Sequence, residues 1–456
     1  MSVGVVILAA GQGTRMKSAL PKVLHKLADK PLVSHAIDTA KSLQADRIAV
    51  VYGHGGEQVL NTINDSNLAW VEQAEQLGTG HAVEQALPAL ADVDRVMVLY
   101  GDVPLIKQET LQALTDKAQQ TELVLLTVNL DDPTGYGRIV RNAAGQVERI
   151  VEQKDAAPEE LAISEVNTGI LIADQSKLQQ WIAKLENSNA QGEFYLTDIV
   201  AMAVAESIAV GSHQPEHEFE VMGVNDRVQL AELERRYQQV EAERLMRAGV
   251  TLRDPARFDL RGTLQAGQDV EIDVNVLIEG DVILGDGVQV GANTVLRNCR
   301  IAAGVQIKEN CVIEQAEVGP EAIIGPFSRL RPDTKLAAKV HVGNFVEIKK
   351  STVDEGSKIN HLSYVGDAEV GKTVNIGAGT ITCNYDGANK YTTVIGDNAF
   401  IGSDSQLVAP VEVAEGATIG AGSTITKNTP PNTLTLSRSK QMSLKSWNRP
   451  VKQPKD

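Results

Sequence analysis

Residues 8–22 form a glycine-rich turn followed by basic residues, the segment best suited to bind an anion. They follow an apolar run, Val3–Leu8, of the length and type expected for a buried strand. Gly11 and Gly13 lack a Cβ atom, so we expect the turn to adopt positive φ and to present backbone N–H groups to an anion. Arg15 and Lys22 add formal positive charge. This order predicts a phosphate cradle large enough for a nucleoside triphosphate.

Glycine is common in any turn that follows a strand, so the two glycines alone favour a structural role. The segment lacks the Gly-Lys-Ser/Thr ending of a P-loop and the third glycine of a dinucleotide-binding turn. As a whole it resembles the signature of sugar-1-phosphate nucleotidyltransferases. The resemblance implies that Arg15 and Lys22 are catalytic groups at the reacting phosphates. It also implies that the nucleotide is bound by Leu8, Ala9, Ala10 and Gly11.

Asp102 follows an expected strand at 96–100, within Tyr100-Gly101-Asp102, and should project toward the same sheet edge as Gly11. An aspartate after glycine is most often a turn residue. Its carboxylate nevertheless suits Mg²⁺, which prefers oxygen ligands and keeps several water ligands. The resemblance implies that Asp102 and Asn225 are the two protein ligands of Mg²⁺, and that Tyr100 and Gly101 lie in the same site.

Two further polar groups are expected at strand ends. Gln73 and the Gly78-Thr79 pair lie in a glycine-rich segment, where a primary amide can donate to and accept from a pyrimidine. They resemble the uracil-reading loop of uridylyltransferases, although a plain polar turn before a helix is an equal alternative. The segments that resemble the sugar-contacting elements of this family contain Gly137, Glu152 and Asn167.

The chain of 456 residues is too long for one ordinary core, so two or three domains are expected. Its formal net charge of −16 argues against nucleic acid or an anionic membrane as the main partner. The three cysteines show no metal-binding or disulfide pattern, and neither a signal peptide nor a membrane span is evident. We therefore expect a cytoplasmic protein.

The pattern of apolar residues divides the chain into an N-terminal domain, a linker helix and a C-terminal repeat region. Up to residue 225, short apolar strands alternate with helical stretches, which predicts a Rossmann-like α/β domain with an open, largely parallel sheet. The clearest strands are expected at 47–52, 96–100, 123–128 and 169–172. Residues 226–249 are expected to form one long linker helix with an apolar stripe that includes Leu230, Leu233, Tyr237, Val240 and Leu245.

Residues 250–436 carry an aliphatic residue at every sixth position, as at Val270, Val276 and Val282 and again from Ile395 to Ile425. A period of six predicts a parallel β-helix, with one aliphatic side chain per short strand pointing inward. The register slips by one residue after Ile348 and breaks between Thr382 and Ile395, so residues 383–394 should protrude as a loop. Residues 437–456 are read as a basic tail.

The predicted β-helix of residues 250–436, called the rod from here on, carries polar residues that its core does not need. His361 has a side chain able to accept a proton from an amine that attacks a thioester, although a lone histidine on a strand is more often a surface residue. Arg331 and Lys349 could hold a sugar phosphate, although charged residues on a rod are usually just solvated. Tyr364 and Asn375 complete the expected sugar-phosphate site. Contacts to the long arm of such a thioester are expected at Ala378, Asn384, Tyr385, Ser403, Ala421 and Arg438.

The repeats resemble those of hexapeptide-repeat acyltransferases, which implies a left-handed coil and a homotrimer. Residues 8–22, 100–102, 224–225, 360–366 and 376–390 together resemble the bacterial family of bifunctional uridylyltransferase/N-acetyltransferases that make UDP-N-acetylglucosamine for cell-wall and lipopolysaccharide precursors. This implies acetylation of glucosamine-1-phosphate by acetyl-CoA, with His361 as base, followed by coupling to UTP with Mg²⁺. One alternative is a single-function nucleotidyltransferase with an oligomerising rod, and another is a catalytically dead scaffold.

Overall fold

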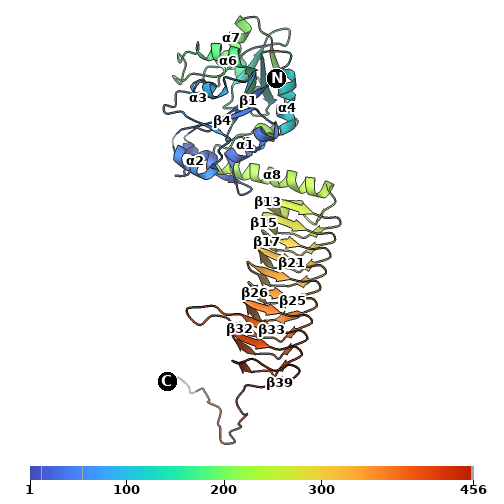
Figure 1. The fold of residues 1–456 in the computed structure, drawn as a ribbon. Helices are drawn as coiled ribbons and strands as arrows, with labels where there is room; N and C mark the ends of the chain where they lie inside the picture. Colours follow the sequence, from blue (N-terminus) through green and yellow to red (C-terminus); the bar gives the residue numbers. More distant parts are fainter. Residues whose placement is uncertain (12, 54, 453–456) are drawn as a thin grey trace. The chain divides into compact units, whose positions relative to one another are not determined.

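The computed structural model describes residues 1–11, 13–53 and 55–452 (Figure 1), so the last four residues of the expected tail lie outside it. The chain divides into two compact units, Met1–Gln238 and Gln239–Asp456. Among the described residues, no helix is long and apolar enough to cross a membrane.

The first unit is built on a mixed sheet with the strand order β11-β7-β10-β6-β1-β4-β5. All of these strands run parallel except β10, so the expected open, largely parallel sheet is confirmed. A hairpin of β8 and β9 pairs with β10, and β2 (Lys26–Leu27) pairs separately with β3 (Lys30–Pro31). The strands of the main sheet are β1 (Val3–Leu8), β4 (Arg47–Tyr52), β5 (Ala69–Glu72), β6 (Arg95–Tyr100), β7 (Leu123–Asn129), β8 (Arg138–Arg141), β9 (Val147–Val151), β10 (Glu165–Asp174) and β11 (Val210–His213).

Helices cover both faces of this sheet. Alternate residues of β1 belong to two different cores: Val5 and Ile7 pack with α1 and α4, and Val6 and Leu8 pack with α3, α6 and α7. The result is a three-layer α/β unit. The helices are α1 (Leu32–Ser42), α2 (Gly56–Ile63), α3 (Thr79–Ala86), α4 (Gln108–Lys117), α5 (Pro158–Leu161), α6 (Gln175–Ile182) and α7 (Asp198–Ala205).

Strand β10 differs from the expected short strand at 169–172. It extends from Glu165 to Asp174, runs antiparallel to both neighbours, and has an irregular register between Asn167 and Leu171. Because it runs the opposite way, its first half lies at the carboxyl ends of β6 and β7. The antiparallel direction therefore brings Asn167 to the edge where Tyr100 ends β6.

Helix α8 (Arg227–Arg247) confirms the expected linker helix. Leu233 is fully buried in a cluster of the first unit that contains Met16, and Leu245 is buried in the core of the second unit. Val240, expected in the apolar stripe, is instead 38% exposed. The apolar stripe is therefore divided between two cores and interrupted at the middle of the helix.

The second unit is a parallel β-helix with three walls. Its first wall is one sheet of β12 (Thr251–Leu252), β14 (Glu271–Ile272), β16 (Gln289–Val290), β19 (Gln306–Ile307), β22 (Ile323–Ile324), β25 (His341–Asn344), β28 (Lys358–His361), β31 (Asn375–Ile376), β34 (Phe400–Ile401), β37 (Thr418–Ile419) and β39 (Leu434–Thr435).

The other two walls form one larger sheet, because the long strands β13 (Phe258–Ala266) and β15 (Val276–Leu284) belong to both. The second wall continues with β17 (Val295–Arg297), β20 (Val312–Glu314), β23 (Arg329–Leu330), β26 (Glu347–Lys349), β29 (Tyr364–Gly366), β32 (Ile381–Cys383), β35 (Gln406–Val408) and β38 (Thr424–Ile425). The third has β18 (Arg300–Ile301), β21 (Ala316–Val318), β24 (Thr334–Leu336), β27 (Thr352–Val353), β30 (Ala368–Val370), β33 (Thr393–Ile395) and β36 (Val411–Val413).

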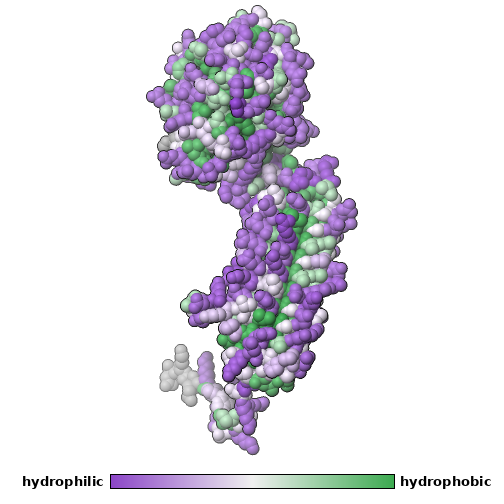
Figure 2. Space-filling model, in the orientation of Figure 1, coloured by the Kyte–Doolittle hydropathy of each residue, from purple (hydrophilic) through white to green (hydrophobic). Residues whose placement is uncertain are grey.

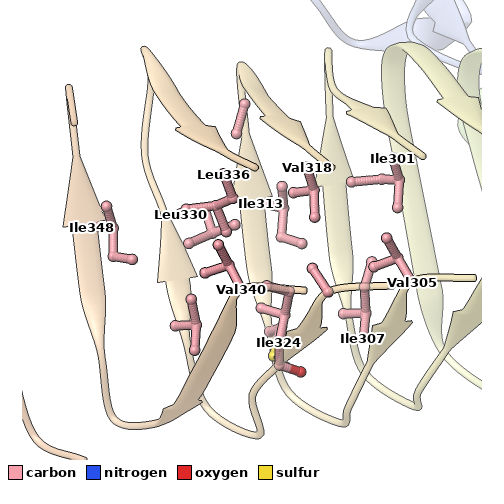
Figure 3. Close-up of a cluster of buried hydrophobic side chains, with 14 of the residues drawn as sticks. Ile301, Val305, Ile307, Ile313, Val318, Ile324, Leu330, Leu336, Val340 and Ile348 are labelled. Atoms are coloured by element: carbon pink, nitrogen blue, oxygen red, sulfur yellow. The ribbon is translucent and has the colours of Figure 1, made fainter. Parts of the chain in front are cut away.

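The aliphatic residue of each six-residue repeat (hexad) points into the core of this β-helix, as expected. One turn of the β-helix, with one strand in each wall, is called a coil. Figure 3 shows Ile301, Ile307 and Ile313 stacked with the equivalent side chains of the following coils. Val270, Val282 and Ile425 are at most 3% exposed. Figure 2 shows that hydrophobic residues also reach the outer surface along this unit, among hydrophilic ones.

The slips in the hexad register have a simple structural basis. Ile324 pairs with Val342, and Val342 pairs in turn with Ile359, so the second of these coils is one residue shorter than the first. The shorter coils lose that residue at the corner between the second and third walls, where Lys350 and Asp367 adopt positive φ. The strands keep their stacking because the difference is absorbed at the corner.

One coil is much longer. Ile376 pairs with Ile401, and the extra residues of this coil form the protruding loop between β32 and β33 (Figure 1). The loop begins after Cys383 and ends before Thr393. Asn384, expected on the protrusion, is in fact buried at its base.

Candidate functional site

The glycine turn after β1 is shaped by Gly13 rather than by Gly11. Gly13 has a φ of 60°, and a Cβ atom there would lie 2.5 Å from the Cβ of Lys22. Gly11 does not adopt positive φ and has open space around it, so the expectation that both glycines need this conformation is wrong. The close approach at Gly13 is what allows Lys22, at the start of a short 3-10 helix (Lys22–Leu24), to lie beside the turn.

Four side chains expected at the reacting phosphates converge. The ammonium of Lys22 donates to Asp102 Oδ2 in a short hydrogen bond and also contacts Asn225 Oδ1 at 3.3 Å. Arg15 Nη2 donates to the same Asn225 oxygen at 2.9 Å. The backbone positions this group, because Val224 N donates to Asp102 O at 2.9 Å and Gly101 N donates to Leu8 O at 2.9 Å.

A pocket of about 330 Å³ opens beside this cluster. Gln73 is 4% exposed and directly follows β5, while Gln76 Nε2 donates to Ala10 O at 2.7 Å and so joins two walls of the pocket. The expected residues that line it are Leu8, Ala9, Ala10, Gly11, Lys22, Gln73, Gly78, Thr79, Tyr100 and Asp102. Residues 73–79 and 8–11 thus form two sides of one cavity.

A smaller pocket of about 190 Å³ shares Thr79, Tyr100 and Glu193 with the first. It contains Glu152 and Asn167, the two side chains expected to contact a sugar. Burial raises the pKa of Glu152, although a hydrogen bond from Thr197 Oγ1 at 3.2 Å opposes this shift. Burial, and then the carboxylates of Asp102 and Glu152, raise the pKa of Tyr100, so its phenol remains a hydrogen-bond donor.

Gly137 lies next to two side chains of this second pocket, Asn167 and Glu152. Its carbonyl accepts a hydrogen bond from Asn167 N at 2.8 Å, and a Cβ atom there would lie 3.0 Å from Ile150 Cγ2 and 3.3 Å from Glu152 Oε1. A side chain at this position would therefore press on Glu152. The residue is placed to shape the pocket through its backbone.

His361 lies at the end of β28, exposed on the rod. Its Nδ1 is 3.2 Å from Oδ1 of Asn344, which occupies the equivalent position one coil earlier. Since an amide oxygen only accepts, this contact requires a hydrogen on Nδ1 and leaves the lone pair on Nε2. His361 is thus oriented with Nε2 as its basic atom.

Four of the six expected acetyl-CoA residues form a column that starts at His361. Gly379 N donates to His361 O at 3.4 Å, Asp404 N donates to Ala378 O at 2.7 Å, and Gly422 N donates to Ser403 O at 2.8 Å. At the far end, Arg438 Nη1 donates to Ala421 O at 2.9 Å. The residues of this column, one per coil, are His361, Ala378, Ser403, Ala421 and Arg438.

A second polar cluster lies on the second wall. Arg331 Nη1 pairs with Glu347 Oε1 at 2.8 Å, and Glu347 pairs in register with Tyr364 on the next strand. The pKa of Lys349 is lowered, chiefly by its neighbour Lys390 and then by desolvation. The two lysines come from the wall and from the protruding loop, so the loop adds a cation to this cluster.

Three other expected residues lie apart from His361 within the chain. Asn375 pairs in register with Lys358, at the opposite end of β28 from His361. Asn384 Nδ2 donates to Asp367 Oδ2 at 2.5 Å in the interior of the corner. Tyr385 is 59% exposed on the loop, where its hydroxyl donates to Gly387 O at 2.5 Å.

Sequence reasoning missed several partners of the expected residues. Asn344 contacts His361, Glu347 contacts Arg331, and Asp367 contacts Asn384. In each pair the two residues lie about one coil of the β-helix apart along the chain. The coil length, which the repeat reveals, could therefore have predicted that they are neighbours. The contacts of Gln76 with Ala10 and of Lys390 with Lys349 follow no such repeat, so the sequence pattern could not have predicted them.

Comparisons with known proteins agree with this geometry. Residues 5–161 match the model of the MobA-like NTP transferase domain, and residues 392–427 match the bacterial transferase hexapeptide repeats. The bifunctional protein GlmU of Azoarcus sp. (strain BH72) is 61% identical over 98% of this chain and 99% of its own length. Those of Ralstonia nicotianae and Marinobacter nauticus are 58% and 59% identical, over 99% and 98% of this chain and 99% of each relative. The chain belongs to the GlmU family of bifunctional proteins.

Proposed function

We propose that the protein catalyses two successive reactions. The second unit transfers the acetyl group of acetyl-CoA to the amine of glucosamine-1-phosphate. The first unit then joins the N-acetylglucosamine-1-phosphate to UTP and releases pyrophosphate. The observation that carries this proposal is the presence of two separate polar sites: the convergence of Lys22, Asp102 and Asn225, and the oriented base His361.

In the uridylyl transfer, a phosphate oxygen of the sugar phosphate attacks the α-phosphorus of UTP. The bond from that phosphorus to the bridging oxygen breaks, and pyrophosphate leaves. Arg15 and Lys22 are the cations available to offset the negative charge on the phosphate oxygens. Glu152 and Asn167 face the adjoining pocket, which suits hydrogen bonds to sugar hydroxyl and acetamido groups.

Asp102 and Asn225 are the proposed ligands of Mg²⁺. Their oxygens Oδ2 and Oδ1 both contact one cationic atom, Lys22 Nζ, so a carboxylate and an amide oxygen already converge on a single positive charge. Two such hard donors suit a metal that keeps water and phosphate as its other ligands. When bound, Mg²⁺ would neutralise charge on the phosphates.

In the acetyl transfer, the amine nitrogen of glucosamine-1-phosphate attacks the thioester carbonyl carbon. His361 Nε2 removes a proton from that nitrogen, the C–S bond breaks, and the CoA sulfur leaves as a thiolate that takes up this proton from His361 to become the thiol. Asn344 holds the imidazole in the required tautomer. Arg331, Lys349 and Tyr364 are the proposed ligands of the sugar phosphate, and the column from Ala378 to Arg438 is the proposed binding surface for CoA; the Arg331–Glu347 ion pair and the contact of Arg438 with Ala421 support these assignments.

We also propose that the rods associate as a homotrimer in the cytoplasm. Phe327 and Phe345 stack at 5.4 Å on one corner of the rod, with Leu362 next in the same column, and these side chains are 50%, 55% and 63% exposed. A second copy of the chain would bury such a ridge. The three cysteines are free, which suits a reducing compartment.

The proposal is tested by supplying the purified protein with glucosamine-1-phosphate, acetyl-CoA, UTP and Mg²⁺. The variant His361→Ala should release no CoA but should still use preformed N-acetylglucosamine-1-phosphate. The variant Lys22→Ala should do the reverse. Loss of both activities in either variant would contradict two independent sites, and absence of CoA release by the wild type would favour a single-function nucleotidyltransferase.

A further inference from the structure

The amide of Gln73 is fixed in one orientation. Its Nε2 lies 3.1 Å from Gly78 O and 3.1 Å from His81 Nδ1. A carbonyl oxygen can only accept, so the amide nitrogen must face Gly78. Both N–H bonds of Gln73 are then engaged, one by each partner. Among the described residues, Oε1 of Gln73 has no hydrogen-bond partner and belongs to a residue that lines the larger pocket.

The carbonyl of Gly78 is held in place by the adjacent chain. Phe194 N donates to Leu77 O at 2.8 Å, and Gly80 N donates to Phe194 O at 2.9 Å. Gly78 has a φ of 114°, and a Cβ atom there would lie 2.7 Å from Phe194 O. The first partner of the Gln73 amide is therefore a rigid backbone group.

His81 supplies the second partner, from the first turn of α3. Because Gln73 Nε2 donates, His81 Nδ1 must carry a lone pair, and the ring hydrogen must be on Nε2. With a hydrogen on Nδ1, two donors would face each other. The neutral Nε2–H form of His81 is thus the state that matches this orientation of Gln73.

We infer that His81 is a positioning residue for base selection: it holds Gln73 so that only an acceptor, Oε1, faces the nucleotide base. This inference rests on the proposed uridylyl transfer. Uracil carries a hydrogen on N3 and can donate to Oε1. Cytosine has a lone pair on N3, which would face the lone pairs of Oε1.

The surrounding backbone supports the same selection. In the described part of the chain, the amide N–H groups of Gly78 and Thr79 donate to no protein acceptor, and both residues line this pocket. These N–H donors beside the acceptor Oε1 of Gln73 match the imide of uracil, in which two carbonyl oxygens flank an N–H group. The amino group of cytosine would instead meet donors.

The test compares kcat/KM for UTP and CTP, with N-acetylglucosamine-1-phosphate and Mg²⁺, in the wild type and two variants. His81→Phe removes the acceptor, so kcat/KM for UTP should fall roughly tenfold, the effect of one lost anchoring hydrogen bond. The preference for UTP over CTP should fall by a similar factor, because the Gln73 amide becomes free to rotate. His81→Asn keeps an acceptor oxygen and should restore part of the preference.

Two controls separate local from general effects. His217→Phe changes an exposed histidine that lines neither pocket and should leave the UTP/CTP preference unchanged. KM for N-acetylglucosamine-1-phosphate should stay near the wild-type value in His81→Phe. A preference for UTP that survives His81→Phe would overturn the role of His81. A wild type that uses neither nucleotide, or both equally, would instead overturn the proposed function.

Discussion

At the scale of single residues, the conformation of Gly13 decides where Lys22 can lie. Gly13→Ala should destabilise the first unit by about 1–2 kcal/mol from the left-handed backbone alone. The contact with the Lys22 Cβ should also displace the lysine and reduce uridylyl transfer strongly. The free energy of unfolding from denaturant titration measures the first effect.

The matched control for this prediction is Gly11→Ala, because Gly11 has ordinary φ and open space around it. Its free energy of unfolding should equal that of the wild type within about 0.5 kcal/mol. Equal destabilisation by both substitutions would show that crowding at Lys22 is not the cause.

Glu152 gives a prediction on pH. Burial raises its pKa in the folded protein, so the native state holds this proton more tightly than the unfolded chain does. The folded state is therefore favoured below the ordinary carboxyl pKa, and this contribution is lost as pH rises through the raised value. Glu152→Gln should make the first unit more stable than the wild type at neutral pH, and the difference should shrink on acidification.

Denaturant titrations at several pH values measure this difference. Glu148→Gln, at an exposed position of strand β9, which ends just before Glu152, is the control and should show no such trend. A gain in stability from Glu152→Gln that is equal at all pH values would contradict the assigned cause.

Some contacts of the candidate site could be predicted from the sequence and others could not. Asp102 follows Tyr100 and Gly101 at the end of a strand parallel to β1, so its approach to the glycine turn follows from the order of strands. The contact of Gln73 with His81 depends on the conformation of the loop between them, which is hydrogen-bonded to Phe194. Because Phe194 is distant in the sequence, no local pattern predicts that conformation. The burial of Glu152 likewise depends on distant segments.

At the scale of elements, the protruding loop makes the longest coil. Deleting residues 385–391 would shorten the coil from Ile376 to Ile401 to the length of the next one, from Ile401 to Ile419. Because the walls on either side already stack in register, the rod should keep its thermal stability to within a few degrees. Acetyl transfer should fall strongly, since Tyr385 and Lys390 are removed, while uridylyl transfer should persist.

Calorimetry and CoA release measure these two outcomes. Tyr385→Ala and Lys390→Ala in the intact loop show which side chain matters for activity. An unfolded rod after the deletion would mean that the loop stabilises the coil, contrary to this prediction.

The rod itself was largely predictable, because each short strand needs one buried aliphatic side chain and the interval between them is visible in the sequence. Val342, Ile348 and Val353 reveal the shortened corner directly. The direction of β10 was not predictable, because a short apolar segment such as 169–172 has the same composition in a parallel or an antiparallel strand. Only its pairing with β6 and β7 settles the direction.

At the scale of the whole molecule, α8 contributes to two separate cores. Leu233→Ala and Leu245→Ala each remove a buried leucine side chain and should each cost about 2–5 kcal/mol. The first should destabilise the nucleotidyltransferase unit, and the second should destabilise the rod, because the two leucines pack in different clusters. Heat inactivation of the two reactions, assayed separately, distinguishes these effects.

Val240→Ala is the control for both, since that side chain is 38% exposed and should change either stability little. Equal inactivation of both reactions by Leu233→Ala would show that the two units unfold as one.

The column from His361 to Arg438 gives the rod a property that neither residue has alone. Four coils separate the two residues, and parallel strands are spaced at about 4.8 Å, so the column extends over roughly 19 Å. In the proposed acetyl transfer, only a thioester on a long stem would contact both the histidine and the arginine. A donor with a short stem would contact one of them, so the proposed site would select acyl donors by length as well as by chemistry.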